Sequence, residues 1–147
     1  MKATSLTCAQ LVETLTTGGA ETLAVQIANA RAAAGDRSLL YVLQGQPDDL
    51  ARRIDPAVTV RRLGLDRAPL RRLVDFTGSV VRGYRRLAAQ VRADGVEVVQ
   101  SHLPGPNFWT LLLAERAVCA TVPTVHNTRE FDYGDAPALR PPPPPNR

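Results

Sequence analysis

Residues 10–35 constrain the fold of this chain more than any other stretch. Residues 10–15 alternate in polarity and are rich in strand formers, and the run Thr-Thr-Gly-Gly at 16–19 then breaks the pattern. From Ala20 the apolar residues recur at helical spacing: Leu23, Ile27, Ala30 and Ala34. Gly35 stands where a left-handed helix cap is expected. We therefore predict a buried strand, a glycine turn and a long amphipathic helix.

The turn at Gly18 and Gly19 is a candidate phosphate-binding site. At the start of a helix the backbone amides have no partner within the helix, and their partial positive charge favours an anion. Glycine has no side chain that would keep a ligand away from the backbone. A tight turn that serves only helix packing is the simpler interpretation of the same two residues.

Strand-like and helix-like segments alternate along the rest of the chain. We predict strands at residues 38–43, 58–63, 96–101 and 122–126, helices at 69–93 and 108–119, and a helical turn or two within 48–54. This alternation implies an α/β fold with a Rossmann-like parallel sheet flanked by helices on both faces. We expect the strand order 3-2-1-4-5, with the third strand at an edge because Arg61 and Arg62 interrupt it.

Both histidines of the chain lie where a predicted strand ends. His102 follows the fourth strand. His126 is the last residue of the fifth strand, and Asn127 comes directly after it. In a doubly wound sheet, ligands bind at the carboxyl ends of the strands, where the strand order reverses. We therefore expect these three residues to share one edge with Gly18 and Gly19, where an imidazole can bond sugar hydroxyls or phosphate. The simpler alternative for His102 is a hydrogen bond to a local carbonyl.

The composition excludes several classes of function. A chain of 147 residues is long enough for one domain. Lys2 is the only lysine, so the chain has neither a G-K-[ST] phosphate loop nor an internal lysine for a Schiff base. Cys8 and Cys119 lie far apart, and with two histidines they make no metal-binding motif, so we expect no metal and reduced thiols in a cytoplasm. We expect no secretion signal and no membrane span.

Four passages, in this order, resemble family-4 glycosyltransferases of the GT-B fold. They are GGAE at 18–21, ARAAAGDRSLLYVL at 30–43, VEVVQSH at 96–102 and VPTVHNT at 122–128. The resemblance implies that the chain is the N-terminal domain, which is one half of a GT-B fold. It implies that Gly18 and Gly19 lie near the donor phosphate and the acceptor. It also implies that His126 contacts the transferred sugar, as the candidate catalytic residue, and that His102 helps to line the acceptor side.

The resemblance also implies a reaction. Such enzymes transfer a hexose from a nucleotide sugar, such as a UDP- or GDP-hexose, to an acceptor, usually with retention and without a bound metal. We therefore expect no cofactor, with the nucleotide sugar as co-substrate. The family's second domain binds the nucleotide, and we find no segment for it here, so we expect a truncated enzyme. It would comprise an acceptor-side domain at 1–135 and a disordered proline-rich tail at 136–147. Alone it should be inactive, because stabilising the leaving diphosphate needs both domains.

Alternative functions rest on other features. The predicted helix at 69–93 carries six arginines against Asp75, which suits docking on an anionic membrane surface or on a partner, although a solvated face is the simpler interpretation. A dinucleotide-dependent oxidoreductase would need G-x-G-x-x-G after the first strand, where this chain has TGGAE. We expect no nucleic-acid binding, because aromatic residues make up only 5% of the chain.

Overall fold

The computed structural model describes residues 5–65 and 73–126 of the chain. Within this part, five parallel strands form one sheet in the order β3-β2-β1-β4-β5, which confirms the predicted topology. The strands are β1 (Thr7–Val12), β2 (Arg37–Val42), β3 (Thr59–Arg62), β4 (Val98–His102) and β5 (Ala120–Thr124). Because all five strands are parallel, their carboxyl ends lie at one edge of the sheet.

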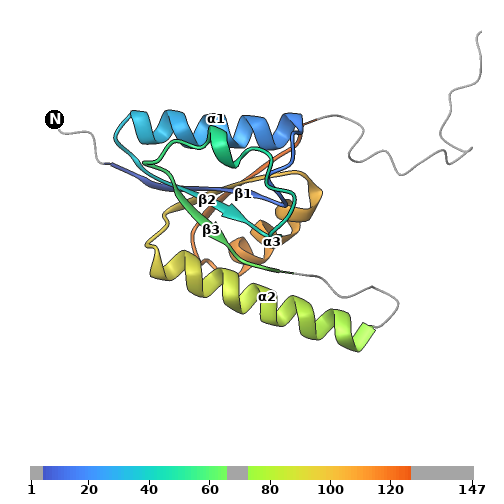
Figure 1. Ribbon diagram of the computed structural model, residues 1–147. Helices are drawn as coiled ribbons and strands as arrows, with labels where there is room; N and C mark the ends of the chain where they lie inside the picture. Colours follow the sequence, from blue (N-terminus) through green and yellow to red (C-terminus); the bar gives the residue numbers. More distant parts are fainter. Residues whose placement is uncertain (1–4, 66–72, 127–147) are drawn as a thin grey trace, which may run out of the picture.

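Three helices cover the two faces of the sheet (Figure 1). α1 (Gly19–Ala33) lies on one face, and α2 (Leu73–Ala93) and α3 (Pro104–Glu115) lie on the other. The predicted turn before β3 is a short 3-10 helix, η1 (Ala51–Arg53). α2 runs unbroken through both of its glycines, and the first residues of its predicted range, 69–72, lie outside the described part.

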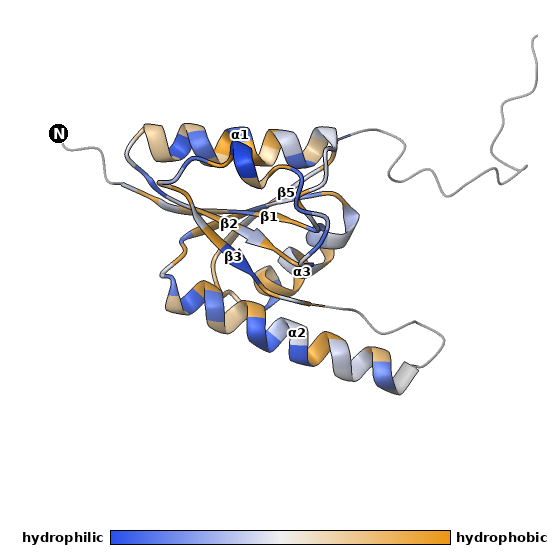
Figure 2. Cartoon of the chain, in the orientation of Figure 1, coloured by the Kyte–Doolittle hydropathy of each residue, from blue (hydrophilic) through white to orange (hydrophobic). Residues whose placement is uncertain are grey.

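Each face of the sheet has its own apolar core. On the side of α1 the core includes Val12, Leu15, Ala24, Val25, Ala28, Leu40 and Val42. On the side of α2 and α3 it includes Ala9, Leu11, Leu39, Tyr41, Leu87, Val91, Trp109 and Leu113. Successive residues of a strand point to opposite faces, so β1 and β2 supply both cores. The predicted edge strand β3 is confirmed at the edge, and its polar part stands out in blue in Figure 2.

β1 lies three residues earlier than we predicted from the alternation at 10–15. The strand pairs from Thr7 to Val12 and then leaves the ladder. Leu15 is nevertheless fully buried, and its N–H donates to the carbonyl oxygen of Pro47 at 3.1 Å. The apolar pattern therefore marked burial rather than strand pairing. As a consequence Gln10 lies in the middle of β1 and not at its start.

Helix α1 begins within one residue of its predicted start, but it buries a different face. Leu23 is 40% exposed, and the buried residues lie at Ala24, Val25 and Ala28. Small alanine side chains allow the helix to approach the sheet closely, and the Ser38 hydroxyl donates to the carbonyl oxygen of Ala28 at 2.8 Å. The apolar spacing was correct for a helix, but close packing selected the alanine face.

The second half of the chain also differs from the prediction in register. Helix α3 begins at Pro104, ahead of the predicted start at residue 108, because proline fits the first turn of a helix where the N–H has no partner. The helix therefore ends at Glu115 and β5 begins at Ala120. β5 is an edge strand with largely exposed residues. Pro123 is tolerated there because an edge strand need not donate on its outer side.

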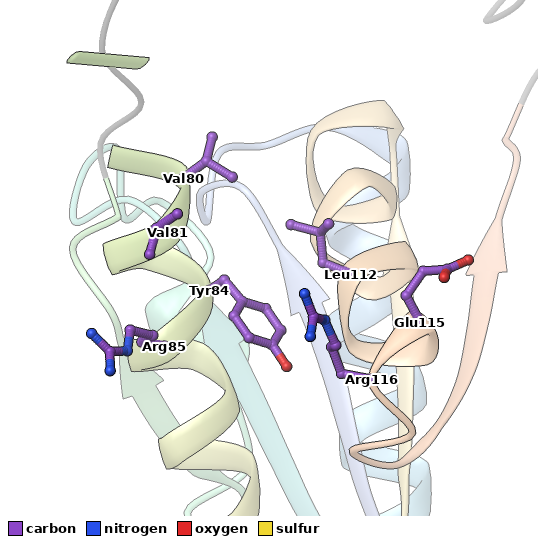
Figure 3. Close-up of a pocket in the computed structure, with 7 residues that line it drawn as sticks. All are labelled: Val80, Val81, Tyr84, Arg85, Leu112, Glu115 and Arg116. Atoms are coloured by element: carbon purple, nitrogen blue, oxygen red, sulfur yellow. The ribbon is translucent and has the colours of Figure 1, made fainter. Parts of the chain in front are cut away.

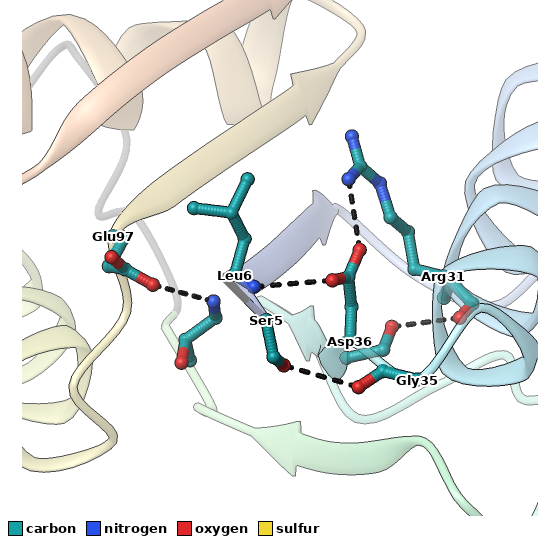
Figure 4. Close-up of polar contacts among 9 residues, drawn as sticks. Ser5, Leu6, Arg31, Gly35, Asp36 and Glu97 are labelled. Carbon is teal, nitrogen blue, oxygen red and sulfur yellow. Dashed lines mark hydrogen bonds and ion pairs between the residues drawn. The ribbon is translucent and has the colours of Figure 1, made fainter. Parts of the chain in front are cut away.

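Polar contacts fix the amino end of β1 (Figure 4). The N–H of Leu6 donates to Asp36 Oδ1 at 3.2 Å, and the N–H of Thr7 donates to Glu97 Oε2 at 2.8 Å. Arg31 forms an ion pair with Asp36 at 3.0 Å. Gly35 has a φ of +89°, which confirms the predicted left-handed end of α1. These contacts hold the amino end of the central strand, opposite the edge at which the histidines lie.

Candidate functional site

The two histidines meet at the carboxyl edge of the sheet, as the strand pattern predicted. His102 is the last residue of β4, and His126 lies two residues beyond the end of β5. His102 Nδ1 and His126 Nε2 are 2.9 Å apart, and the rings are nearly parallel, with an interplanar angle of 28°. Asn127, the third residue expected here, lies outside the described residues.

His102 is fully buried, so its surroundings differ from both of our sequence-based interpretations. Its Nε2 lies 2.7 Å from Oε1 of Gln10, and its Nδ1 faces His126, so neither nitrogen bonds a local carbonyl. Burial, and to a lesser degree the nearby His126, lowers the pKa of His102 to about 4. The ring is therefore neutral at pH 7. Its neighbour His126 is half-buried.

Gln10 belongs to this cluster, and sequence reasoning missed it. The side chain is 3% exposed in the middle of the central strand, where apolar residues surround it in the sequence. A buried polar group of this kind nearly always has a hydrogen-bond partner. The signal was therefore present in the sequence, as an amide within a buried strand, but nothing in the sequence said which partner it would meet.

Side chains at the start of α3 fix the end of β5, and so the position of His126. The Ser101 hydroxyl donates to Asn107 Oδ1 at 2.6 Å, and Asn107 Nδ2 donates to the carbonyl oxygen of Thr124 at 3.2 Å. Between β4 and α3, Leu103 has a φ of 77°, a conformation that non-glycine residues rarely adopt. Such strained residues cluster at functional sites, at a cost of about 1–3 kcal/mol each.

Gly18 and Gly19 lie at the start of α1, and the structure gives them different surroundings. Gly18 is the N-cap residue, and its N–H donates to the carbonyl oxygen of Thr16 at 2.9 Å. We expected this amide to have no partner, and that prediction is wrong for Gly18. A Cβ at Gly18 would collide with the carboxylate of Glu21, which is 6% exposed. A Cβ at Gly19 would meet no atom within 4 Å. The open space that a ligand needs is therefore at Gly19.

A second buried polar cluster centres on Asp94, which is 4% exposed. Its carboxylate accepts from Arg61 at 2.9 Å, from the Tyr41 hydroxyl at 3.0 Å and from Gln90 at 2.9 Å. The Arg61 guanidinium is the main reason that the pKa of Asp94 falls to about 2. Burial, with the carboxylate beside it, raises the pKa of the Tyr41 phenol. All four side chains are paired within the cluster, so it serves the fold.

An apolar groove of about 350 Å³ lies away from the histidine edge, between α2 and α3 (Figure 3). It is lined by Val80, Val81, Tyr84, Arg85, Leu112, Glu115 and Arg116. Within residues 5–65 and 73–126, no three His, Cys, Asp or Glu side chains are grouped to hold a metal ion, and both cysteines are free. No helix of the described part is long and apolar enough to cross a membrane.

Comparison with known protein families places the chain. The family model described as Glycosyltransferase Family 4 matches residues 17–146, which include both glycines and both histidines of the candidate site. Gln10 precedes the matched region. A search of the curated proteins finds no match to the chain.

Proposed function

Because the chain belongs to glycosyltransferase family 4, we propose that it is the acceptor-side domain of an enzyme that transfers a hexose from a nucleotide sugar to an acceptor. The proposal includes a UDP- or GDP-hexose as co-substrate, retention at the sugar carbon and no bound metal or cofactor. One observation carries it: His126 is held at the same edge of the sheet at which the amino end of α1 begins. That edge is where ligands bind in parallel α/β sheets.

In this proposal each group at the edge has a separate task. The amino end of α1, open at Gly19, attracts the diphosphate of the donor. His126 contacts a hydroxyl of the transferred sugar. Asn127 follows it directly in the chain and is a further candidate contact. Because His102 is buried, it does not contact the substrate itself and acts through its contact with His126.

The chemistry needs a second domain to complete the site. A leaving diphosphate is stabilised best by fixed donors on all sides, in a site from which water is excluded. The described residues supply one wall of such a site. We therefore propose that a nucleotide-binding domain, in a longer chain or in a partner, supplies the other wall, and that these 147 residues alone do not transfer sugar.

Two measurements test the proposal on the 147-residue chain. In an NMR titration, UDP-glucose or GDP-mannose should shift the signals of the Gly19 amide and the His126 ring. UMP or GMP should shift them much less, because the nucleoside is held by the other domain. In His126→Gln the sugar-dependent shifts should weaken. Shifts confined to other parts of the sheet, or radiolabelled sugar transfer by the chain alone, would contradict the proposal.

A docking function is a second candidate, and the groove between α2 and α3 favours it. Val81 is 49% exposed on the α2 side of the groove, and Arg85 and Arg116 line the same groove from α2 and from the end of α3 (Figure 3). Apolar side chains flanked by arginines suit an anionic membrane surface, where each basic residue is worth about 1 kcal/mol. We propose that this face holds the enzyme at the cytoplasmic side of a membrane while the histidine edge carries out the transfer.

Vesicle sedimentation tests the docking function. Binding should need anionic lipid, weaken with salt, and fall when Arg85 and Arg116, the two arginines that line the groove, are changed to Gln. Changing Arg52 and Arg53 to Gln is the control, because these exposed arginines lie beside α1 on the opposite face of the sheet. Equal binding to neutral and anionic vesicles would remove this function and leave the transfer proposal untouched.

A further inference from the structure

A buried chain of three polar side chains leads from the central strand to the candidate sugar site. Gln10 comes from β1, His102 from β4 and His126 from the segment after β5. The distances are 2.7 Å from Gln10 Oε1 to His102 Nε2 and 2.9 Å from His102 Nδ1 to His126 Nε2. Only His126 has substantial exposed surface.

The first contact decides where the proton of His102 lies. A glutamine Oε1 only accepts hydrogen bonds, so His102 must donate from Nε2. A fully buried ring without an acid beside it stays neutral at pH 7, in agreement with its lowered pKa. A neutral imidazole has one N–H, so Nδ1 of His102 carries a lone pair and accepts.

The second contact determines which nitrogen of His126 carries the proton. Because Nδ1 of His102 accepts, Nε2 of His126 must carry the proton that it shares with its neighbour. In neutral His126 the remaining nitrogen, Nδ1, therefore has a lone pair. A partner of that nitrogen must donate a hydrogen bond, which a sugar hydroxyl does and a phosphate oxyanion or a carbonyl does not.

We propose that Gln10 and His102 are positioning residues that fix the tautomer of His126, so that its Nδ1 accepts a hydrogen bond from a hydroxyl of the transferred sugar. This inference rests on the proposed function for the identity of the ligand. The tautomer itself follows from the contacts within the chain. It also explains why an amide lies in the apolar centre of β1, where a buried polar group would otherwise cost stability.

Imidazole nitrogen NMR tests the proposal on the whole 147-residue chain, with no ligand present. The chain has only two histidines, so the signals that remain in a His126→Gln variant belong to His102. The comparison assigns the signals of both rings. At a pH well above the usual range of histidine, where the neutral tautomers are observed, each ring should show a protonated Nε2 and an unprotonated Nδ1. A proton on Nδ1 of His126 in the unaltered chain would overturn the proposal, whether or not any variant folds.

Three variants of strand glutamines then test the role of Gln10. Gln10→Met keeps the length of the side chain but removes the acceptor, so both tautomers of each ring should be populated. The nitrogen chemical shifts of both rings should then lie between those of a protonated and an unprotonated nitrogen. Gln10→Glu places an acid beside the buried ring and favours a proton on both nitrogens of His102, so Nε2 of His126 should then accept and its proton should move to Nδ1. Gln100→Met is the matched control, because Gln100 pairs with Gln10 across β1 and β4 but donates to Thr124. An unchanged pattern in Gln10→Met would contradict the proposal.

A sugar titration separates this inference from the proposed function. Gln10→Met should weaken the nucleotide-sugar response of His126 by about three- to tenfold, the worth of one hydrogen bond, whereas Gln100→Met should not. If the tautomers are as proposed but no sugar binds, the proposed function fails and the tautomer assignment stands. If sugar binds equally well to both Met variants, the positioning role fails and the proposed function stands.

Discussion

Changing Gly19 to Ala should stabilise the fold and weaken ligand binding at the same time. Gly19 is the first residue of α1, its φ is not positive, and an added Cβ meets no atom within 4 Å. Alanine is preferred to glycine in a helix, and Gly→Ala at a compatible position stabilises a protein by about 0.4–1 kcal/mol. For a chain of this size that gain corresponds to a rise in Tm of about 1–4 °C.

The same methyl group stands where the proposed diphosphate approaches the helix. A hydrogen bond to a charged group is worth about 1.5–3 kcal/mol, so its loss should weaken nucleotide-sugar binding about tenfold or more. A purely structural glycine predicts the opposite combination, in which stability falls and any effect on binding follows from unfolding. The two interpretations of the glycine turn therefore differ in the sign of the stability change.

Thermal unfolding by circular dichroism and an NMR titration with GDP-mannose or UDP-glucose measure the two effects. Gly18→Ala is the matched neighbour, since its Cβ would collide with the Glu21 carboxylate and should not stabilise the fold. Our reasoning is wrong if Gly19→Ala lowers the Tm, or if it raises the Tm while the affinity for nucleotide sugar stays the same.

Further predictions concern the two faces of the fold. The pKa of Asp94 is lowered to about 2 from 3.8 by Arg61, so its stabilising contribution is full above pH 4 and lost as the pH falls through about 2. In urea unfolding between pH 7 and pH 2, the loss of free energy of unfolding should be about 2 kcal/mol smaller for Asp94→Asn than for the unaltered chain. Identical pH profiles for the two proteins would show that Asp94 does not cause this dependence. Gly83→Ala places a Cβ 2.5 Å from the buried ring of Trp109 and should destabilise by about 1–3 kcal/mol in urea unfolding. Gly78→Ala in the same helix meets only a flexible guanidinium and should be neutral or stabilising, so equal losses for both variants would contradict the packing argument.

The strand order and the meeting of the histidines could be predicted because both follow from regular alternation. In a parallel sheet all strands end at one edge, so knowing which strand precedes each histidine was sufficient. The exact strand limits did not matter for this result. β4 includes His102 instead of ending before it, and His126 follows β5 by two residues, yet the two rings still meet.

The role of Gln10 could not be predicted, because it depends on the register between strands. The alternation at 10–15 placed Gln10 at the start of β1, whereas the backbone pairs it with Gln100 in the middle of the sheet. The buried face of α1 was missed for a related reason. Alanines lie on several sides of that helix, so hydropathy alone did not distinguish the stripe through Leu23 from the one through Ala24.

The position of His126 depends on how an edge strand is held. β5 has a neighbour on one side only, within the described residues, and most of its surface is exposed. Its last residue, Thr124, accepts from Asn107 through its carbonyl oxygen and from Gln100 through its hydroxyl. The first turn of α3 therefore fixes the backbone of the segment that leads to His126, whereas the amide of Gln100 donates only to the side chain of Thr124. A substitution at Asn107 should therefore shift the NMR signals of the His126 ring, which makes the start of α3 part of the site.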